Sequence, residues 1–162
     1  MVYSRALFNR LLIVVTYLWI CSNVYAEGLT SSQKEKISSE ISMLFEKSIK
    51  AGESFDIDGI TGNVNDTLKA GFIDNGLFFN AFDELMTGFK EGIKGFRSQK
   101  MNITNKRITI LSDNVVLVTA SGNYTVTLED GRTLSGRFAW TFVYSKINDK
   151  WKVIHSHMSN PE

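Results

Sequence analysis

The feature that most constrains the fold is a long run of alternating, β-type sequence. The pattern of the chain changes from Lys100, and Ile108 and Ile110 start this run. Three turn signals divide it: Asp113-Asn114, Asp130-Gly131 and Asn148-Asp149. Asp-Gly between two alternating runs is typical of a hairpin, and Asn and Asp favour tight turns generally. After a first strand that contains Ile108 and Ile110, the predicted strands are Val115–Leu128, Thr133–Lys146 and Trp151–Met158. Short turns between consecutive strands predict a four-stranded antiparallel meander.

The length and faces of these strands predict a curved sheet with both sides covered. Two of the strands run about 14 residues, or roughly 45 Å at 3.3 Å each, so they must twist and bend into a half-open cone. In Thr133–Lys146, one face carries four aromatic residues, Phe138, Trp140, Phe142 and Tyr144, and the other carries Ala139, Thr141 and Val143. A face exposed to water should carry charge. We therefore expect helices on one face and a second subunit on the other.

Three amphipathic segments precede the strands. Ser32 and Glu35 fit a capping box, and apolar residues at helical spacing then continue to a helix end near Ala51-Gly52. A weaker helix is expected over Asp56–Ala70, and a turn with one short strand over Gly71–Asn80. A third helix is expected over Phe82–Phe96.

The first 26 residues have the pattern of an export signal. Arg5 and Arg10 precede the apolar stretch Leu11–Ile20, and Val24-Tyr25-Ala26 places small residues at the −3 and −1 positions. We expect cleavage after Ala26 and a single domain over residues 27–162, in the periplasm or secreted. The apolar stretch is short for a membrane span, and an uncleaved anchor is the alternative.

Composition restricts the function of this domain. Removing residues 1–26 from the 162-residue chain leaves 136 residues, takes away Cys21, the only cysteine, and leaves 16 Lys and Arg against 17 Asp and Glu. Disulfide and thiol chemistry are therefore not expected, nor is a nucleic-acid-binding patch. After cleavage no association with a membrane is expected.

Two segments resemble the nuclear transport factor 2-like superfamily, in its SnoaL-like and ketosteroid-isomerase-like branch. The first is Ala51-Gly52-Glu53 through Asp56–Ile60, which resembles the family's elbow between helices one and two. The second runs from Trp140–Val143 through Asp149–Ser159, and also resembles the association domain of calcium/calmodulin-dependent kinase. The resemblance implies an α+β cone, a curved antiparallel sheet packed on three N-terminal helices. It also implies a pocket between helices and sheet, and a homodimer. It does not imply one activity.

Asp74 is the sharpest candidate for chemistry. The resemblance places it where steroid isomerases keep their general base, and a carboxylate shielded by apolar neighbours has a raised pKa that suits proton abstraction. The alternative is a turn aspartate beside Asn75-Gly76. The positions that supply the isomerases' oxyanion donors fall on Phe45 and near Trp140-Thr141. These residues offer neither the hydroxyl nor the acid, so steroid-type isomerisation is not expected.

The two histidines of the chain, His155 and His157, are expected to share a strand face with Trp151 and Val153. They could bind zinc with a third ligand, form an acid/base dyad with Asp74, or hydrogen-bond inside the fold.

The expected ligand contacts are Phe45, Phe72, Tyr124, Arg137, Trp140 and Tyr144. Arg137 could instead lie at a dimer rim. No metal site and no cofactor are expected.

These observations predict an exported protein that binds a small apolar or amphipathic molecule in a pocket, without turnover. One alternative is an isomerase, cyclase or dehydratase that uses Asp74 with His155 or His157. Another is a homo-oligomerisation or partner-binding module, whose pocket Phe45, Phe72 and Trp140 would fill.

Overall fold

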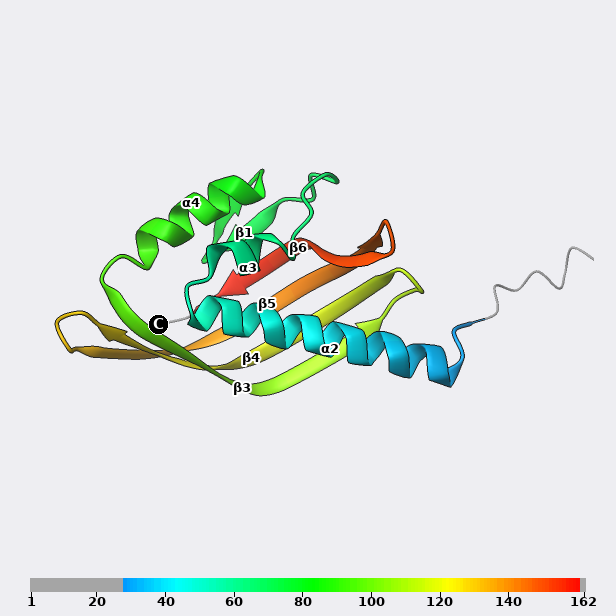
Figure 1. Ribbon diagram of the computed structural model, residues 1–162, viewed down its shortest axis with the longest axis horizontal. Coiled ribbons are helices and arrows are strands. Elements are labelled where there is room, and N and C mark those ends of the chain that lie inside the picture. Colours follow the sequence, from blue (N-terminus) through cyan, green and yellow to red (C-terminus); the bar gives the residue numbers. More distant parts are fainter. Residues whose placement is uncertain (1–27, 161–162) are drawn as a thin grey trace, which may run out of the picture. The chain divides into compact units, whose positions relative to one another are not determined.

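The computed structural model describes residues 28–160, of which those from Ser31 onward belong to one compact α+β unit (Figure 1). Helices pack on one face of a curved sheet, as the sequence predicts. The predicted export signal, its cleavage point after Ala26 and Cys21 lie outside the described residues. Within the described part of the chain, no helix is both long and apolar enough to span a membrane.

The sheet has six strands in the order β2-β1-β6-β5-β4-β3. Their bounds are β1 Phe72–Asp74, β2 Leu77–Phe79, β3 Phe96–Ile110, β4 Val115–Leu128, β5 Thr133–Ile147 and β6 Lys150–Ser159. The predicted meander, β3 to β6, is confirmed. The segment expected to hold one short strand forms the hairpin β1–β2 instead, and β1 joins the sheet by pairing parallel to β6.

The predicted start of β3 is wrong. This strand begins at Phe96, twelve residues before Ile108, and Phe96 is not the end of the preceding helix. Gly95 adopts a left-handed backbone (φ +82°) that turns the chain from helix into strand. The start of this strand is hard to recognise in the sequence. Its inward residues, Gln99 and Met101, alternate with exposed polar and charged residues, so the segment shows no apolar stripe.

The second predicted helix is much shorter than expected. Helix α3 covers only Ile57–Thr61, and the Asp56 side chain caps it by accepting a hydrogen bond from the Gly59 amide (2.9 Å). The chain then bonds to β6: the Asn65 amide donates to the carbonyl oxygen of Val153, whose amide donates to Asn63 (both 2.9 Å). These bonds hold the backbone in a loop and prevent the helix from continuing to Ala70.

Helices α2 (Ser31–Glu53) and α4 (Phe82–Gly92) confirm the two other helical predictions, with shifted ends. Helix α2 begins one residue before the expected cap, so Ser32 lies inside it. Helix α4 receives its cap from Glu84, whose Oε2 accepts from the amides of Asn80 (3.0 Å) and Ala81 (3.4 Å).

The core has two parts that face the same space. Helix α2 packs along β3, and buries Ile37, Ile41 and Phe45 toward the sheet (Figure 1). Helix α4 packs on β1 and β2, where Phe72, Phe82, Leu85 and Met86 form a buried cluster. The space between these two layers and the sheet holds the candidate site.

Candidate functional site

A cavity of about 380 Å³ lies between the helices and the inner face of the sheet. Its wall is mainly apolar and includes eight aromatic side chains: Phe45, Phe82, Phe89, Phe96, Tyr124, Trp140, Phe142 and Tyr144. The rings of Phe45 and Phe142 meet edge to face at 5.9 Å, and those of Trp140 and Phe142 at 6.1 Å. Volume and lining are typical of a small-molecule site.

Most polar groups in this wall are engaged with neighbours. Tyr144 is buried, and its hydroxyl bonds to Ser48, whose own hydroxyl donates to the Leu44 carbonyl (3.1 Å). Burial raises the pKa of Tyr144 far above its usual value, so the phenol is neutral. The Gln99 amide donates to the carbonyl oxygen of Gly52. These groups stabilise the wall more than they offer bonds to a ligand.

Asp74 differs from these groups. It is half-buried, lines the cavity, and its carboxylate has no hydrogen bond or ion pair with any described residue. Burial raises the pKa of Asp74 above its ordinary value. The turn beside it is made by Asn75 (φ +48°) and Gly76 (φ +81°), while Asp74 itself pairs in the ladder with Leu77 and Met158.

The histidines are not where the alternation predicts. Register along β6 runs Val153 opposite Tyr144 and then His155 opposite Val143, so Ile154 is an extra residue, a β-bulge. One extra residue moves every later side chain to the other face. The expectation that His155 and His157 share a face with Val153 is therefore wrong.

Neither histidine meets Asp74 in the cavity. The Nδ1 of His155 donates to the carbonyl oxygen of Gly71 (2.8 Å), and His157 lies on the outer face of the sheet. The side chains that β6 turns toward the cavity after the bulge are Ser156 and Met158. The structure thus does not bring together the acid/base dyad considered from the sequence.

The other predicted site residues divide into two groups. Phe45, Tyr124, Trp140 and Tyr144 line the cavity. Phe72 is fully buried behind it, 5.1 Å from the ring of Phe82. Arg137 is exposed on the outer face opposite Asn123 and is not among the residues that line the cavity. Its alternative place, at a dimer rim, stays a prediction.

Several cavity residues were missed. Phe82, Met86 and Phe89 lie in the segment for which the sequence predicted a third helix and no site residue. Gln99 and Met101 lie on the part of β3 that was not recognised as strand. The alternation of Gln99, Met101 and Ile103 with exposed polar residues is the signal that could have found them.

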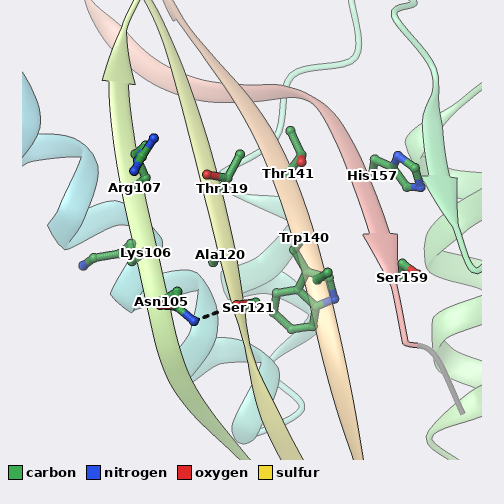
Figure 2. Close-up of a pocket in the computed structure, with 11 residues that line it drawn as sticks. Asn105, Lys106, Arg107, Thr119, Ala120, Ser121, Trp140, Thr141, His157 and Ser159 are labelled. Carbon is green, nitrogen blue, oxygen red and sulfur yellow. Dashed lines mark hydrogen bonds between the residues drawn. The ribbon is translucent and has the colours of Figure 1, made fainter.

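The outer face of the sheet carries a second, more polar groove, shown in Figure 2. Arg107, Thr119, Thr141 and His157 lie in one register row across β3, β4, β5 and β6 (Figure 2). The next row of outward-facing side chains consists of Asn105, Ser121, Ala139 and Ser159. In this row, Asn105 donates a hydrogen bond to the Ser121 hydroxyl (3.2 Å) (Figure 2). This face is built of small and hydroxyl side chains rather than of the apolar residues expected for burial.

The titratable residues in the wall of the cavity are Asp74, Tyr124 and Tyr144, and no Lys, Arg or His is among its lining residues. Within residues 28–160, no cluster of three or more His, Cys, Asp or Glu could hold a metal ion. Chemically, the cavity can bury an apolar molecule and present one carboxylate to it.

Residues 41–162 match the SnoaL-like domain family. No curated protein matches the chain. Among solved structures, a nuclear transport factor 2-like protein of Salmonella enterica aligns with a TM-score of 0.67 and 19% identity, covering 83% of this chain and 94% of that one.

Two further structures show the same fold. A nuclear transport factor 2-like protein of unknown function from Shewanella oneidensis aligns with a TM-score of 0.57 and 24% identity, over 75% of this chain and 98% of that one. A hexachlorocyclohexane dehydrochlorinase, LinA type 2, aligns with a TM-score of 0.69 and 12% identity, over 82% and 90%. At these identities the likeness concerns the fold alone.

Proposed function

The chain belongs to the SnoaL-like domain family, and from this premise we propose that it binds an apolar or amphipathic small molecule in the cavity between its helices and sheet, without turning it over. The observation that carries the proposal is the aromatic-lined cavity of about 380 Å³ that holds a single carboxylate. Acid–base catalysis ordinarily needs a proton donor and acceptor placed within hydrogen-bond reach of the substrate. The cavity lining holds no histidine to complete that set.

Binding is testable with a neutral fluorescent ligand, N-phenyl-1-naphthylamine, alongside native mass spectrometry of the purified protein for a co-purified molecule. Val64→Phe fills the cavity from the loop side and should abolish fluorescence enhancement. Thr119→Phe, on the exposed outer face, is the matched control and should leave it unchanged. No saturable enhancement in the wild-type protein, together with no co-purified ligand, would exclude the binding function.

A second candidate is an isomerase or dehydratase that uses Asp74 alone as the base. It is favoured by the half-buried position of the carboxylate and its raised pKa. Such an enzyme would exchange a carbon-bound proton of the co-purified molecule for deuterium in D2O. Deuterium incorporation that disappears in Asp74→Asn would favour the enzyme over the binding protein.

Two further features belong to the proposal. Ser121, Ala139 and Thr141, in the centre of the outer face, carry no charge. Their neutrality supports pairing with a second copy of the chain through this face, because charged residues are depleted at the centre of interfaces. The basic and apolar pattern of residues 1–26 supports export. An exported, processed protein should have Glu27 as its first residue in intact-mass and N-terminal analysis, and a retained Met1 would contradict it.

A further inference from the structure

The charge and aromatic character of the cavity point to one ligand class. We propose that the ligand is a hydrophobic amine, whose protonated nitrogen pairs with Asp74 while its apolar body fills the aromatic part of the cavity. This inference rests on the proposed binding function and specifies its ligand. It depends on three observations, which concern charge, the free carboxylate and the position of the aromatic rings.

Charge selects the ligand first. With Asp74 ionised, the wall carries one negative charge, and its lining residues include no Lys, Arg or His to offset it. An anionic ligand would be repelled and would find no counter-ion. A neutral apolar ligand would remove water from the carboxylate and give nothing in return, which is costly for a buried charge. A cation both fits the space and compensates the carboxylate.

The carboxylate is also free and held in place. Within the described chain, no hydrogen bond or ion pair engages the Asp74 side chain, so both oxygens remain available to a ligand. Its backbone is paired on both sides, with Leu77 in β2 and Met158 in β6. Asn75 adds two bonds to the end of β6: its amide donates to the Met158 carbonyl (2.9 Å), and its Oδ1 accepts from the Asn160 amide (2.8 Å). Because the backbone of Asp74 is already ordered, only its short side chain loses conformational entropy when a ligand binds.

An aromatic side chain lies in the same register row as this carboxylate. Asp74, Met158 and Trp140 occupy one row across β1, β6 and β5, and all three line the cavity. Adjacent strands are about 4.8 Å apart, so the backbones of Asp74 and Trp140 are separated by roughly 10 Å. A ligand whose ammonium group contacts the carboxylate can therefore place its apolar body against the aromatic part of the wall.

Neighbouring side chains hold the indole in place. Its Nε1 donates to the Asn160 side chain (3.4 Å), and its ring packs against Phe138 at 4.3 Å between centroids. The N–H of the indole is thus occupied, and the ring adds an apolar surface to the wall. Farther along the cavity, Leu85, Phe89 and Val126 supply an uncharged wall for the hydrophobic body of the ligand.

The test compares three ligands that differ only in their polar group: 2-naphthylmethylamine, 2-naphthylmethanol and 2-naphthoic acid, measured by calorimetry at pH 7. We expect the amine to bind about tenfold or more tightly than the alcohol, the value of one charged hydrogen bond, and the acid to bind weakest. Asp74→Asn should remove the preference for the amine and leave alcohol binding within about twofold. Asp58→Asn, an exposed carboxylate on α3, is the matched control and should change neither.

Each other outcome is informative. Three results would overturn the amine inference while the binding function stands. These are equal binding of amine and alcohol, tightest binding of the acid, and a preference for the amine that survives in Asp74→Asn. Binding of N-phenyl-1-naphthylamine without binding of any of the three ligands would also overturn it. If the wild-type protein binds neither that neutral dye nor the three ligands, the binding function itself fails. Thermal melts of both variants verify that they are folded.

Discussion

At the scale of single residues, Asp74 combines a strand position with an unpaired, half-buried carboxylate. A group needed only for folding would normally find partners, because an unpaired buried charge lowers stability. The backbone of Asp74 serves the sheet, and the adjacent turn is left to Asn75-Gly76. Its side chain therefore costs the free protein stability that a ligand can restore.

Replacing Asp74 with Asn should keep or increase stability at pH 7. Burial raises the pKa of Asp74 in the folded state, so the fold disfavours the ionised form. The penalty is absent below the unfolded pKa of about 3.9 and develops as pH rises through the higher folded value. Burial raises the pKa of Tyr144, another titratable group of the cavity wall, so this phenol stays neutral in this range.

Urea melts of both proteins at pH 3 and pH 7 test this sign. The unfolding free energy of Asp74→Asn should be close to that of the wild type at pH 3. At pH 7 it should be equal to that of the wild type or higher. If Asp74→Asn matches the wild type at pH 3 but is less stable than the wild type at pH 7, the carboxylate has a stabilising partner.

Tyr144 shows the opposite use of a polar residue in the cavity wall. Its phenol is buried and bonded to Ser48. Tyr144→Phe should lower the free energy of unfolding by about 1 kcal/mol, and Ser48→Ala by about 1–3 kcal/mol because it leaves the phenol unpaired. The double variant should lose less than the sum of the two, as denaturant melts in a double-mutant cycle can measure. Additive losses would show that the two hydroxyls do not interact.

At the scale of elements, the bulge at Ile154 decides which β6 side chains enter the cavity. Before it, Trp151 and Val153 face the helices, and the Nε1 of Trp151 donates to Glu40 of α2 (2.9 Å). After it, the histidines face outward and Met158 faces inward. A bulge keeps a strand in the sheet while it redirects side chains. Here it removes both imidazoles from the cavity.

Gly122 in β4 permits a close approach of β3, beside the register shift between Ile103 and Asn105. A Cβ at this position would lie 2.0 Å from the Asn102 carbonyl oxygen and 2.7 Å from the ring of Phe138. Gly122→Ala should therefore destabilise the protein by about 1–3 kcal/mol, because backbone and ring must both shift.

Gly88→Ala is the matched control for this effect. Gly88 lies in α4, and a Cβ there meets nothing within 4 Å. The same chemical change should stabilise the protein by up to about 1 kcal/mol, since Ala favours helix more than Gly does. Thermal melts of both variants should shift in opposite directions. A neutral effect of Gly122→Ala would show that the neighbouring backbone and ring can shift without a loss of stability.

At the scale of the whole molecule, the outer face of the sheet leads to a prediction about assembly. If two copies pair through this face, light scattering of the protein should give roughly twice the monomer mass. A stable interface of this kind buries about 800 Å² from each partner. Thr119→Arg places a charge in the centre of that face, close to Arg107 in the same row, and should produce monomers.

Ser39→Arg, on the exposed side of α2, is the control and should leave the dimer intact. Binding of N-phenyl-1-naphthylamine should persist in both variants, because the cavity lies on the other side of the sheet. A monomeric wild-type protein at micromolar concentration would contradict the dimer.

Much of the fold followed from local signals in the sequence. Turn residues and alternation predicted β4 to the residue, and gave β5 and β6 to within one residue at each end. The apolar stripes predicted α2 and α4. The errors occurred where distant contacts decide local structure. Residues 63–65 bond to β6 and end the helix, and the first residues of β3 are strand because they pair with β4.

The cavity shows the same division between sequence and tertiary structure. Alternation along β5 by itself determined that Trp140, Phe142 and Tyr144 share a face, because side chains in a regular strand have a period of two residues. The sequence could not determine which residues of β6 join them, since a one-residue bulge reverses the faces and depends on pairing with β5 and β1. Asp74 enters the same register row as Trp140 only through the parallel pairing of β1 with β6, two segments about 80 residues apart in the chain. Local sequence encodes the period of each element, and only packing of the whole chain decides which faces meet.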